Sequence, residues 1–473
     1  MRTFRLVGAA LLLAVVAHFV PARATAAEVK KSNYKGWKTY ELSNGLVDVQ
    51  VAPDIGGRII QYKLGDFEFL WVNDQLAGKM PPPTGLGPKG EWLNYGGDKL
   101  WPAPQGWSGE NEWPGPPGPV PNAEGLPNKA RIVGEKKGGS VEIELIAPKD
   151  QYAGIQFSRR IRVQDEAASV SIVSTMTNID TKPRRWGIWE IAQINCAERK
   201  GLSFDKNVTA YCPMNPKSIF PNGFKVLYGA ADNPGWQPDL ERKIMKVRYV
   251  RQVGKVGLDS VAGWLAVVRG TEGRVLVERF KAFPKDQYPD DASVEFWLQA
   301  PGKFVAGGKE YTVADDPTEA PPYMEAELLS PYAELRPGQS YTFHNQWLAT
   351  NIGGGFPILD CNELGVICEP LGCSAAWGAT RLVVWGRFGI FHKGTVRIRF
   401  LNDTGTTVGN DPLEMPVSPD RAFTPLSVDW VQNNVNVPQG AKRIALILTN
   451  VAGKELGQLG RAPIGYTTSQ VKP

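Results

Sequence analysis

The chain has 473 residues, a formal net charge of +5, 51 glycines and 38 prolines. The basic excess is small and no run of like charges forms a stripe, which argues against nucleic acid or an anionic membrane surface as the partner. The length predicts two domains, and the density of turn residues favours many short strands over helices.

The first residues have the pattern of a secretory signal. Arg2 and Arg5 form a basic start, an apolar segment covers residues 6–20, and small residues lead up to Ala26. We therefore expect residues 1–26 to be a signal peptide and the mature chain to be secreted or periplasmic, with a retained anchor as the alternative. We expect no transmembrane segment after the signal, because no later apolar run is long enough to span a bilayer.

Strand patterns recur along the rest of the chain, with turns between them and no long helical period. The predicted strands include residues 46–51, 67–72, 140–146, 154–163, 169–178, 186–194, 261–268, 274–280, 292–299, 323–329, 340–349, 382–385, 395–400, 426–431 and 443–448. We expect one large β domain over residues 34–351 and a small β-sandwich over residues 360–473, separated by a glycine-rich boundary.

A stretch rich in Pro, Gly and Trp runs from residue 79 to residue 127 and predicts a long, ordered loop. Within it, residues 94–105 combine an acid, a base, a tryptophan and an amide with paired glycines. Glycine lets a backbone approach a ligand closely, so we interpret this segment as a ligand-gripping loop and not as a regular strand. An ordinary surface loop held by a buried tryptophan is the alternative. The candidate side chains are Asp98, Lys99, Trp101 and Gln105.

Histidine is scarce, because only His344 and His392 lie beyond the leader. This argues against a multi-histidine metal site or a serine–histidine–aspartate triad. No nucleotide-binding motif is present. We expect no cofactor and no required metal, although the turn at Asn402 and Asp403 has ligands that suit calcium.

The five cysteines are compatible with one or two disulfides in an oxidising compartment, with at least one thiol left over. No zinc-type spacing is present. We interpret the last three as a local staple at the domain junction and leave the pairing open. The cysteines are Cys196, Cys212, Cys361, Cys368 and Cys373.

Carboxylates are the remaining candidates for chemistry. Glu325 and Glu327 alternate with apolar residues, so both lie on one face of a predicted strand. Asp98 and Glu190 are the other two candidates. Two carboxyl groups across a sugar can act as acid and base where burial separates their pKa values. Arg58 follows two glycines and either forks onto sugar hydroxyls or forms a structural ion pair.

Several motifs resemble the DUF4380 family, a group within the galactose mutarotase-like superfamily. They are residues 51–59, 70–73 and 96–105, and residues 325–331 and 335–340 resemble the closing strands of the superfamily domain. The resemblance covers about residues 34–351. It implies an all-β, galactose mutarotase-like β-supersandwich that holds a carbohydrate on its concave face, followed here by the smaller C-terminal β-sandwich.

The resemblance also implies a chemistry. Aldose epimerases of this fold open a sugar ring with a carboxylate base and a histidine acid. By position, the base maps onto Glu327, with Glu325 as the adjacent choice. Residues 189–193 stand where the epimerases carry a histidine, so Lys99 or Asp98 would have to supply the acid.

We therefore expect a secreted carbohydrate-binding protein. The expected sugar contacts are Arg58, Asp98, Lys99, Trp101, Gln105, Glu190 and Gln193. The alternative is a sugar-acting enzyme, either an aldose 1-epimerase-type isomerase with Glu327 as base or a polysaccharide lyase. A structural cell-envelope protein is a third class. The C-terminal domain is either a support or a second sugar module carrying Trp377, Trp385 and Trp430; the sugar and the oligomeric state are left open.

Overall fold

The computed structural model describes residues 26–106, 108–115, 123–134, 139–198, 203–306, 308–376, 381–411, 413–425, 428–429 and 437–467. Within these ranges the chain is all-β, as predicted, and its helical segments are short 3-10 turns. They are η1 (Pro53–Ile55), η2 (Asp74–Leu76), η3 (Ala123–Gly125) and η4 (Pro289–Asp291). The predicted signal peptide, apart from Ala26, lies outside the described residues, as do Trp377 and Trp430. No described helix is long and apolar enough to cross a membrane.

The N-terminal sheet is an antiparallel meander. Its described strands are β1 (Glu28–Tyr34), β2 (Trp37–Ser43), β3 (Val47–Ala52), β4 (Arg58–Leu64) and β5 (Phe67–Glu68). Val47, Val49 and Val51 of β3 are buried, as the alternation of the sequence predicts.

The largest sheet has ten strands in the described chain. In spatial order they are β14 (Trp236–Asp239), β15 (Ile244–Arg248), β12 (Val208–Pro213), β17 (Trp264–Arg269), β18 (Arg274–Phe280), β24 (Ser340–Asn351), β10 (Ser169–Asn178), β9 (Ile155–Gln164), β8 (Ser140–Asp150) and β7 (Lys129–Gly134).

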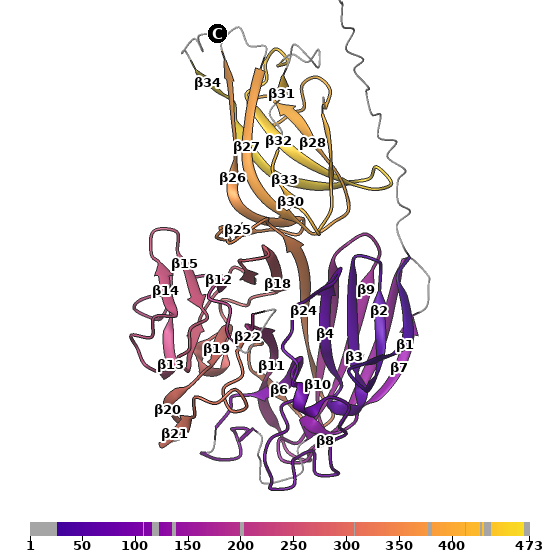
Figure 1. Ribbon diagram of the computed structural model, residues 1–473, viewed down its shortest axis with the longest axis vertical. Coiled ribbons are helices and arrows are strands. Elements are labelled where there is room, and N and C mark those ends of the chain that lie inside the picture. Colours follow the sequence, from indigo (N-terminus) through magenta and orange to yellow (C-terminus); the bar gives the residue numbers. More distant parts are fainter. Residues whose placement is uncertain are drawn as a thin grey trace, which may run out of the picture.

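A sheet of seven described strands packs against the ten-stranded sheet. Its strands are β13 (Lys225–Gly229), β16 (Gly254–Leu258), β19 (Val294–Gln299), β22 (Tyr323–Leu329), β11 (Arg184–Asn195), β23 (Ala333–Leu335) and β6 (Asp98–Ala103), and the hairpin of β20 (Gly302–Ala306) and β21 (Lys309–Val313) forms a sheet of its own. One hydrophobic core joins the three large sheets through residues such as Val49, Ile172 and Ile188. Figure 1 shows β6, β11 and β22 in the middle of this body.

The prediction of an irregular loop over residues 94–105 is wrong for six residues within it. Asp98–Ala103 forms strand β6, which pairs antiparallel with β11. Pro102 is compatible with this strand because β6 lies at a sheet edge. There the N–H that proline lacks would face no neighbouring strand, so no carbonyl loses a hydrogen bond. The strand places Asp98 and Lys99 on opposite faces of the sheet.

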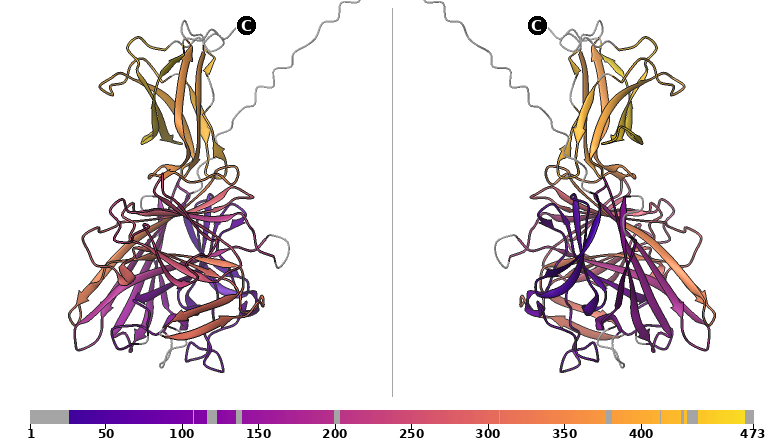
Figure 2. Two further views of the ribbon diagram at one scale, coloured as in Figure 1. Left: turned by 90° about the vertical axis from the view of Figure 1, so that its left-hand side faces the viewer. Right: turned by 90° about the vertical axis from the view of Figure 1, so that its right-hand side faces the viewer.

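The C-terminal strands form two smaller sheets that stand above the larger body (Figure 2). One contains β25 (Asp360–Cys361), β26 (Gly365–Ala376), β27 (Arg381–Ile390), β30 (Ala422–Phe423), β31 (Val428–Asp429) and β34 (Gly465–Thr467), and the other contains β29 (Glu414–Val417), β28 (Gly394–Leu401), β32 (Arg443–Asn450) and β33 (Glu455–Pro463). Their facing residues build a separate core that includes Val396, Leu446 and Phe388. The exact domain boundaries stay a prediction.

The C-terminal strands are joined to the larger body by packing and hydrogen bonds. The backbone N–H of Ala168 donates to the carbonyl of Phe391 at 2.7 Å, and the amide of Asn450 donates to Glu166 at 2.8 Å. A third core cluster includes Trp264 of the body together with Val366 and Phe391.

The predicted disulfide staple is wrong, because all five cysteines are free and buried. Cys361 and Cys368 lie in the core cluster at the junction, whereas Cys373 lies in the core between the two C-terminal sheets. Burial raises the pKa of each of these three thiols to about 12. They act as small apolar side chains.

Candidate functional site

Strand β11 places polar side chains on both faces of the seven-stranded sheet. It pairs with β6 on one side and with β22 on the other. Successive side chains on a strand point to opposite faces. Glu190 therefore points towards the ten-stranded sheet, whereas Trp189 and Gln193 point away from it.

The face towards the ten-stranded sheet carries a buried charge network around Arg159 of β9. The guanidinium contacts Asp98 at 2.5 Å and Glu190 at 3.2 Å. Asp98 also accepts the backbone N–H of Ile59 at 2.6 Å, and the Ser174 hydroxyl donates to Glu190. Asp98 and Glu190 are predicted to contact ligand; in the structure their side chains connect five strands, β4, β6, β9, β10 and β11.

A third carboxyl group, Glu278 of β18, lies in the same interior. Burial raises its pKa well above the ordinary value, and the nearby charges of Glu190 and Asp98 raise it further. Burial also raises the pKa of Glu190, against the lowering effect of Arg159. One cation thus faces three acids, and both burial and the two neighbouring acids favour the neutral form of Glu278.

Arg58 and the paired glycines are structural as well. The Arg58 guanidinium donates to the carbonyls of Ile55 at 2.6 Å and Gly96 at 2.9 Å and forms an ion pair with Glu124. A Cβ on Gly96 would lie 2.4 Å from the carbonyl oxygen of Trp71. The glycines therefore permit a close approach to the protein's own backbone and not to a ligand. Arg58 holds the backbone at Ile55 and Gly96 in place.

The opposite, outer face of the seven-stranded sheet carries a row of polar and aromatic side chains, which we call the outer row. At one end, Lys99 contacts Glu325 at 2.6 Å, and the Gln193 amide donates to the same carboxylate oxygen at 2.9 Å. The Lys99 ammonium lies 4.4 Å from the centre of the Trp101 ring and 4.7 Å from that of Trp92. These are cation–π distances.

The other end of the outer row is a lysine shared by two carboxylates. Lys255 contacts Glu295 at 2.6 Å and Glu327 at 2.9 Å. The Trp189 indole donates to Glu327 at 2.8 Å, and Lys255 lies 4.2 Å from the centre of that ring. Burial raises the pKa of Glu295 to about 8, opposed by the charge of Lys255. Burial raises the pKa of Glu327 too.

Three acceptor oxygens and one donor of the outer row are buried without a hydrogen-bond partner in the described structure. The acceptors are Oε1 of Gln193, Oε1 of Glu295 and Oε1 of Glu327, and the donor is the indole N–H of Trp101. An unsatisfied buried polar group costs about 1–3 kcal/mol. The side chain of Glu325 is 12% exposed. The row thus has more unpaired acceptors than unpaired donors.

Half-buried aromatic rings extend the outer row towards the β20–β21 hairpin. Trp297 lies opposite Glu325 across the β19–β22 pair, so the two share a face. Its ring centre is 5.2 Å from that of Phe304, and Phe304 stacks on Tyr311 at 5.3 Å. The hairpin is thereby packed against this end of the sheet.

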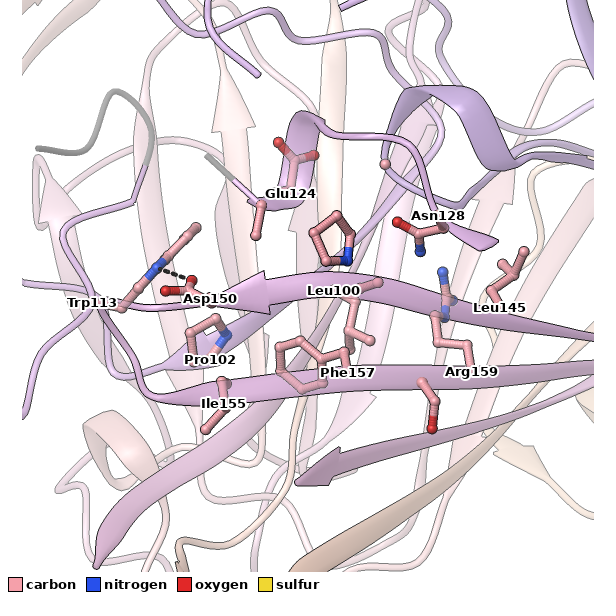
Figure 3. Close-up of a pocket in the computed structure, with 15 residues that line it drawn as sticks. Leu100, Pro102, Trp113, Glu124, Asn128, Leu145, Asp150, Ile155, Phe157 and Arg159 are labelled. Atoms are coloured by element: carbon pink, nitrogen blue, oxygen red, sulfur yellow. Dashed lines mark hydrogen bonds between the residues drawn. The ribbon is translucent and has the colours of Figure 1, made fainter. Parts of the chain in front are cut away.

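A small cavity lies beside the inner network (Figure 3). It has a volume of about 40 Å³, and its lining includes Leu100, Glu124, Asn128 and Arg159. A water molecule needs roughly 10–15 Å³ measured in this way. The cavity therefore has room for a few waters and is too small for a sugar.

The structure brings five of the predicted site residues together in the outer row: Lys99, Trp101, Gln193, Glu325 and Glu327. It places Asp98 and Glu190 on the inner face, Arg58 at a turn, and Gln105 in a loop beside Trp113. Whether any of them contacts ligand stays a prediction.

Sequence reasoning missed Arg159, Lys255 and Glu295. The available signal was a charged residue inside an otherwise apolar strand, since Lys255 and Glu295 both lie in such segments. A charge at that place is rarely buried without a partner. Among the described residues, no group of three or more His, Cys, Asp or Glu side chains is arranged to hold a metal.

The fold and the outer row define an all-β protein whose sheet carries a polar, aromatic-flanked row of side chains. The chain belongs to the family described as Domain of unknown function (DUF4380), whose model matches residues 38–350. The family resemblance of the sequence is confirmed by this match. A comparison with curated proteins found no match.

Solved structures similar to this chain share little sequence with it. A galactose mutarotase-like protein from Lactobacillus casei is 11% identical, with 65% of this chain and 99% of that chain covered and a TM-score of 0.41. A putative aldose 1-epimerase from Escherichia coli is 11% identical, with 68% and 100% covered and a TM-score of 0.38. A TPR-domain containing protein from Parabacteroides distasonis is 14% identical, with 72% of this chain covered and a TM-score of 0.43; this chain spans 56% of its length.

The inner network predicts a large stability effect for Arg159→Met. Removing the cation leaves Asp98 and Glu190 buried without their shared partner, and breaking a buried pair costs about 3–5 kcal/mol. We expect the free energy of unfolding, measured by urea denaturation, to fall by that amount. Arg162→Met on the outward face of the same strand is the control and should change it little. Equal effects of the two substitutions would contradict the network.

The shared-lysine cluster predicts a pH dependence. The pKa of a glutamate in the unfolded chain is about 4.3, whereas burial raises the pKa of Glu295 to about 8 in the folded protein. The folded state then binds more protons over this window, so its stability should fall as pH rises from about 4 to about 8. In Glu295→Gln this fall should be shallower, measured as urea midpoints between pH 5 and pH 9. An unchanged slope would contradict the assignment.

Proposed function

We propose that the protein binds carbohydrate at the outer row. The observation that carries the proposal is the set of unpartnered acceptors on Gln193, Glu295 and Glu327. Sugar hydroxyls are donors of the required kind, and each can also accept from Lys99 or Lys255. A site built with such groups gains selectivity, because ligands that lack hydroxyls leave the buried acceptors unpaired.

Aromatic rings supply the second half of the proposed recognition. Trp92 and Trp297 are half-buried on either side of Glu325 and Lys99. The indole ring presents a large flat apolar surface beside a polar edge. The C–H face of a pyranose ring can pack on such a surface while its hydroxyls contact the polar row.

The charge of the outer row favours a neutral or amino sugar over an acidic one. Lys99 is paired with Glu325, and Lys255 is shared by Glu295 and Glu327, so neither lysine of the row is free to pair with a further acid. A uronate would place its negative charge beside carboxylates that already hold these cations, which disfavours binding. The row therefore does not favour a lyase acting on uronic-acid polymers. We further propose, from the signal-like leader, that binding takes place in the periplasm or outside the cell.

The proposal predicts that Gln193→Met weakens binding and changes stability little. The substitution removes a free acceptor, so affinity for a neutral sugar should fall by about tenfold, equivalent to about 1.4 kcal/mol. Stability should change little, because removal of an unsatisfied buried oxygen offsets loss of the amide hydrogen bond to Glu325, which keeps Lys99 as a partner. Sugars found on a glycan array should be titrated by calorimetry, with the exposed Gln458→Met as control. An array on which wild-type protein binds no sugar would rule out the proposal.

A second candidate function is an aldose 1-epimerase-type isomerase. The observation that favours it is the adjacent pair of Glu295 and Glu327. Burial raises the pKa of Glu295 to about 8, so this carboxyl group keeps its proton at neutral pH. Lys255 and the Trp189 indole stabilise the negative charge of Glu327. Such separation is typical of an acid–base pair. The shared lysine leaves no sugar-sized gap between the two carboxylates, so binding remains the better-supported function.

The enzyme reading predicts that wild-type protein accelerates exchange between the anomers of a free aldose. Glu327→Gln should reduce that acceleration by at least about a hundredfold, the lower range for loss of general base catalysis. Exchange spectroscopy by NMR measures the rate directly, with Glu334→Gln as a surface control. A wild-type rate equal to that of buffer would exclude the epimerase.

A further inference from the structure

An open groove lies where the outer row ends. Its volume is about 380 Å³, and its lining includes Tyr34, Trp71, Asn195 and Thr318. Small-molecule sites have volumes of roughly 300–1,000 Å³. No residue that we assign to the outer row lines this groove, so it is a separate feature of the surface.

Trp71 connects the groove lining to the strands of the outer row. Its backbone N–H donates to the carbonyl of Gln193 at 2.7 Å. The Trp71 ring lies 4.7 Å from the ring of Tyr323, and Tyr323 is two residues before Glu325 on the same face of β22. Trp71 and Tyr323 therefore place the groove next to the Glu325 end of the row.

The chemistry of the lining fits an uncharged ligand. Lys35 is paired with Asp74 at 2.5 Å and Lys63 with Glu68 at 2.8 Å, so the acids of the groove are neutralised. What remains is one tryptophan face together with hydroxyl and amide groups. A neutral sugar has the matching combination of hydroxyls and an apolar ring face.

Tyr34 contributes a hydroxyl group to the groove. Its oxygen accepts from the Gln61 amide at 3.2 Å, and the hydroxyl also forms a hydrogen bond with Glu68. Burial raises the pKa of Tyr34, so the hydroxyl keeps its hydrogen at any physiological pH. Tyr34 is therefore held in a fixed place in the lining, with an uncharged hydroxyl group.

The groove walls are rigid. The Asn73 side chain caps η2 by accepting the N–H of Gln75 at 3.1 Å, and its amide donates to the carbonyl of Asn94 at 3.0 Å. Prolines at 317, 321 and 322 form part of the facing wall and fix their backbone angles. Pre-ordered walls reduce the entropy lost on binding.

We propose that this groove is a second sugar subsite, which takes the neighbouring residue of a neutral oligosaccharide whose first residue occupies the outer row. The inference rests on the proposed function and extends it from a sugar to a sugar chain. Both subsites then act on one ligand, so affinity depends on chain length.

The experiment compares chain lengths. Wild-type protein is titrated by calorimetry with neutral gluco-, galacto-, manno- and xylo-saccharides of one to six residues. We expect at least tenfold tighter binding of the best oligosaccharide than of its monosaccharide. Thr318→Trp fills the groove from its exposed rim, and Trp71→Ala removes the ring; each should abolish that difference and leave monosaccharide affinity within twofold. Ile219→Ala, at an exposed side chain outside the groove lining, is the control.

The outcomes separate the two proposals. If sugars bind but wild-type protein shows no length preference, or if both groove variants retain it, the second subsite is wrong while the proposed function stands. If no saccharide binds to wild-type protein, both are wrong. Thr318→Trp keeps the test valid should Trp71→Ala fail to fold, because Thr318 is exposed.

Discussion

The structure depends on one buried cation. Arg159 reaches from β9 to Asp98 on β6 and Glu190 on β11, and so fixes the edge strand, the central strand and the facing sheet with a single guanidinium. An arginine suits this role because its planar fork contacts two acids at once and does not lose its charge. The edge strand it holds is the one that carries Lys99 to the outer face.

The alternation of β11 then divides the polar residues into two sets with different properties. On the inner face, Asp98 and Glu190 are paired with Arg159, and the cavity beside them is too small for a sugar; Oε1 of Glu278 has no partner there. On the outer face, Gln193 and Glu327 keep oxygens without partners. Unsatisfied buried groups in a native protein call for an explanation. A bound ligand that supplies donors would be such an explanation, and it would also account for the aromatic rings beside the row.

The sequence predicts the β class and most strand positions, because alternation is a local property: residues 169–178 and 323–329 are strands as expected. It cannot tell which face of a sheet a side chain will take, since that depends on register with distant strands. Asp98 and Lys99 are both expected to contact sugar for this reason, but they lie on opposite faces once β6 pairs with β11. The role of Lys255 could not be predicted, because its partners Glu295 and Glu327 are 40 and 72 positions away along the chain and no local sequence pattern links them.

The groove adds a consequence for how the outer row would be used. If the row binds only one sugar residue, the contacts with that residue alone must offset the unfavourable free energy of its unpaired oxygens. A neighbouring groove with a tryptophan and uncharged hydroxyl and amide groups would add binding energy without adding charge. Trp71 occupies the junction, since its backbone is bonded to β11 while its ring lies against Tyr323. Its position therefore couples the order of the groove to the order of the strand that carries Gln193, and a ligand that spans both would stabilise the same strand that Arg159 holds from the other face.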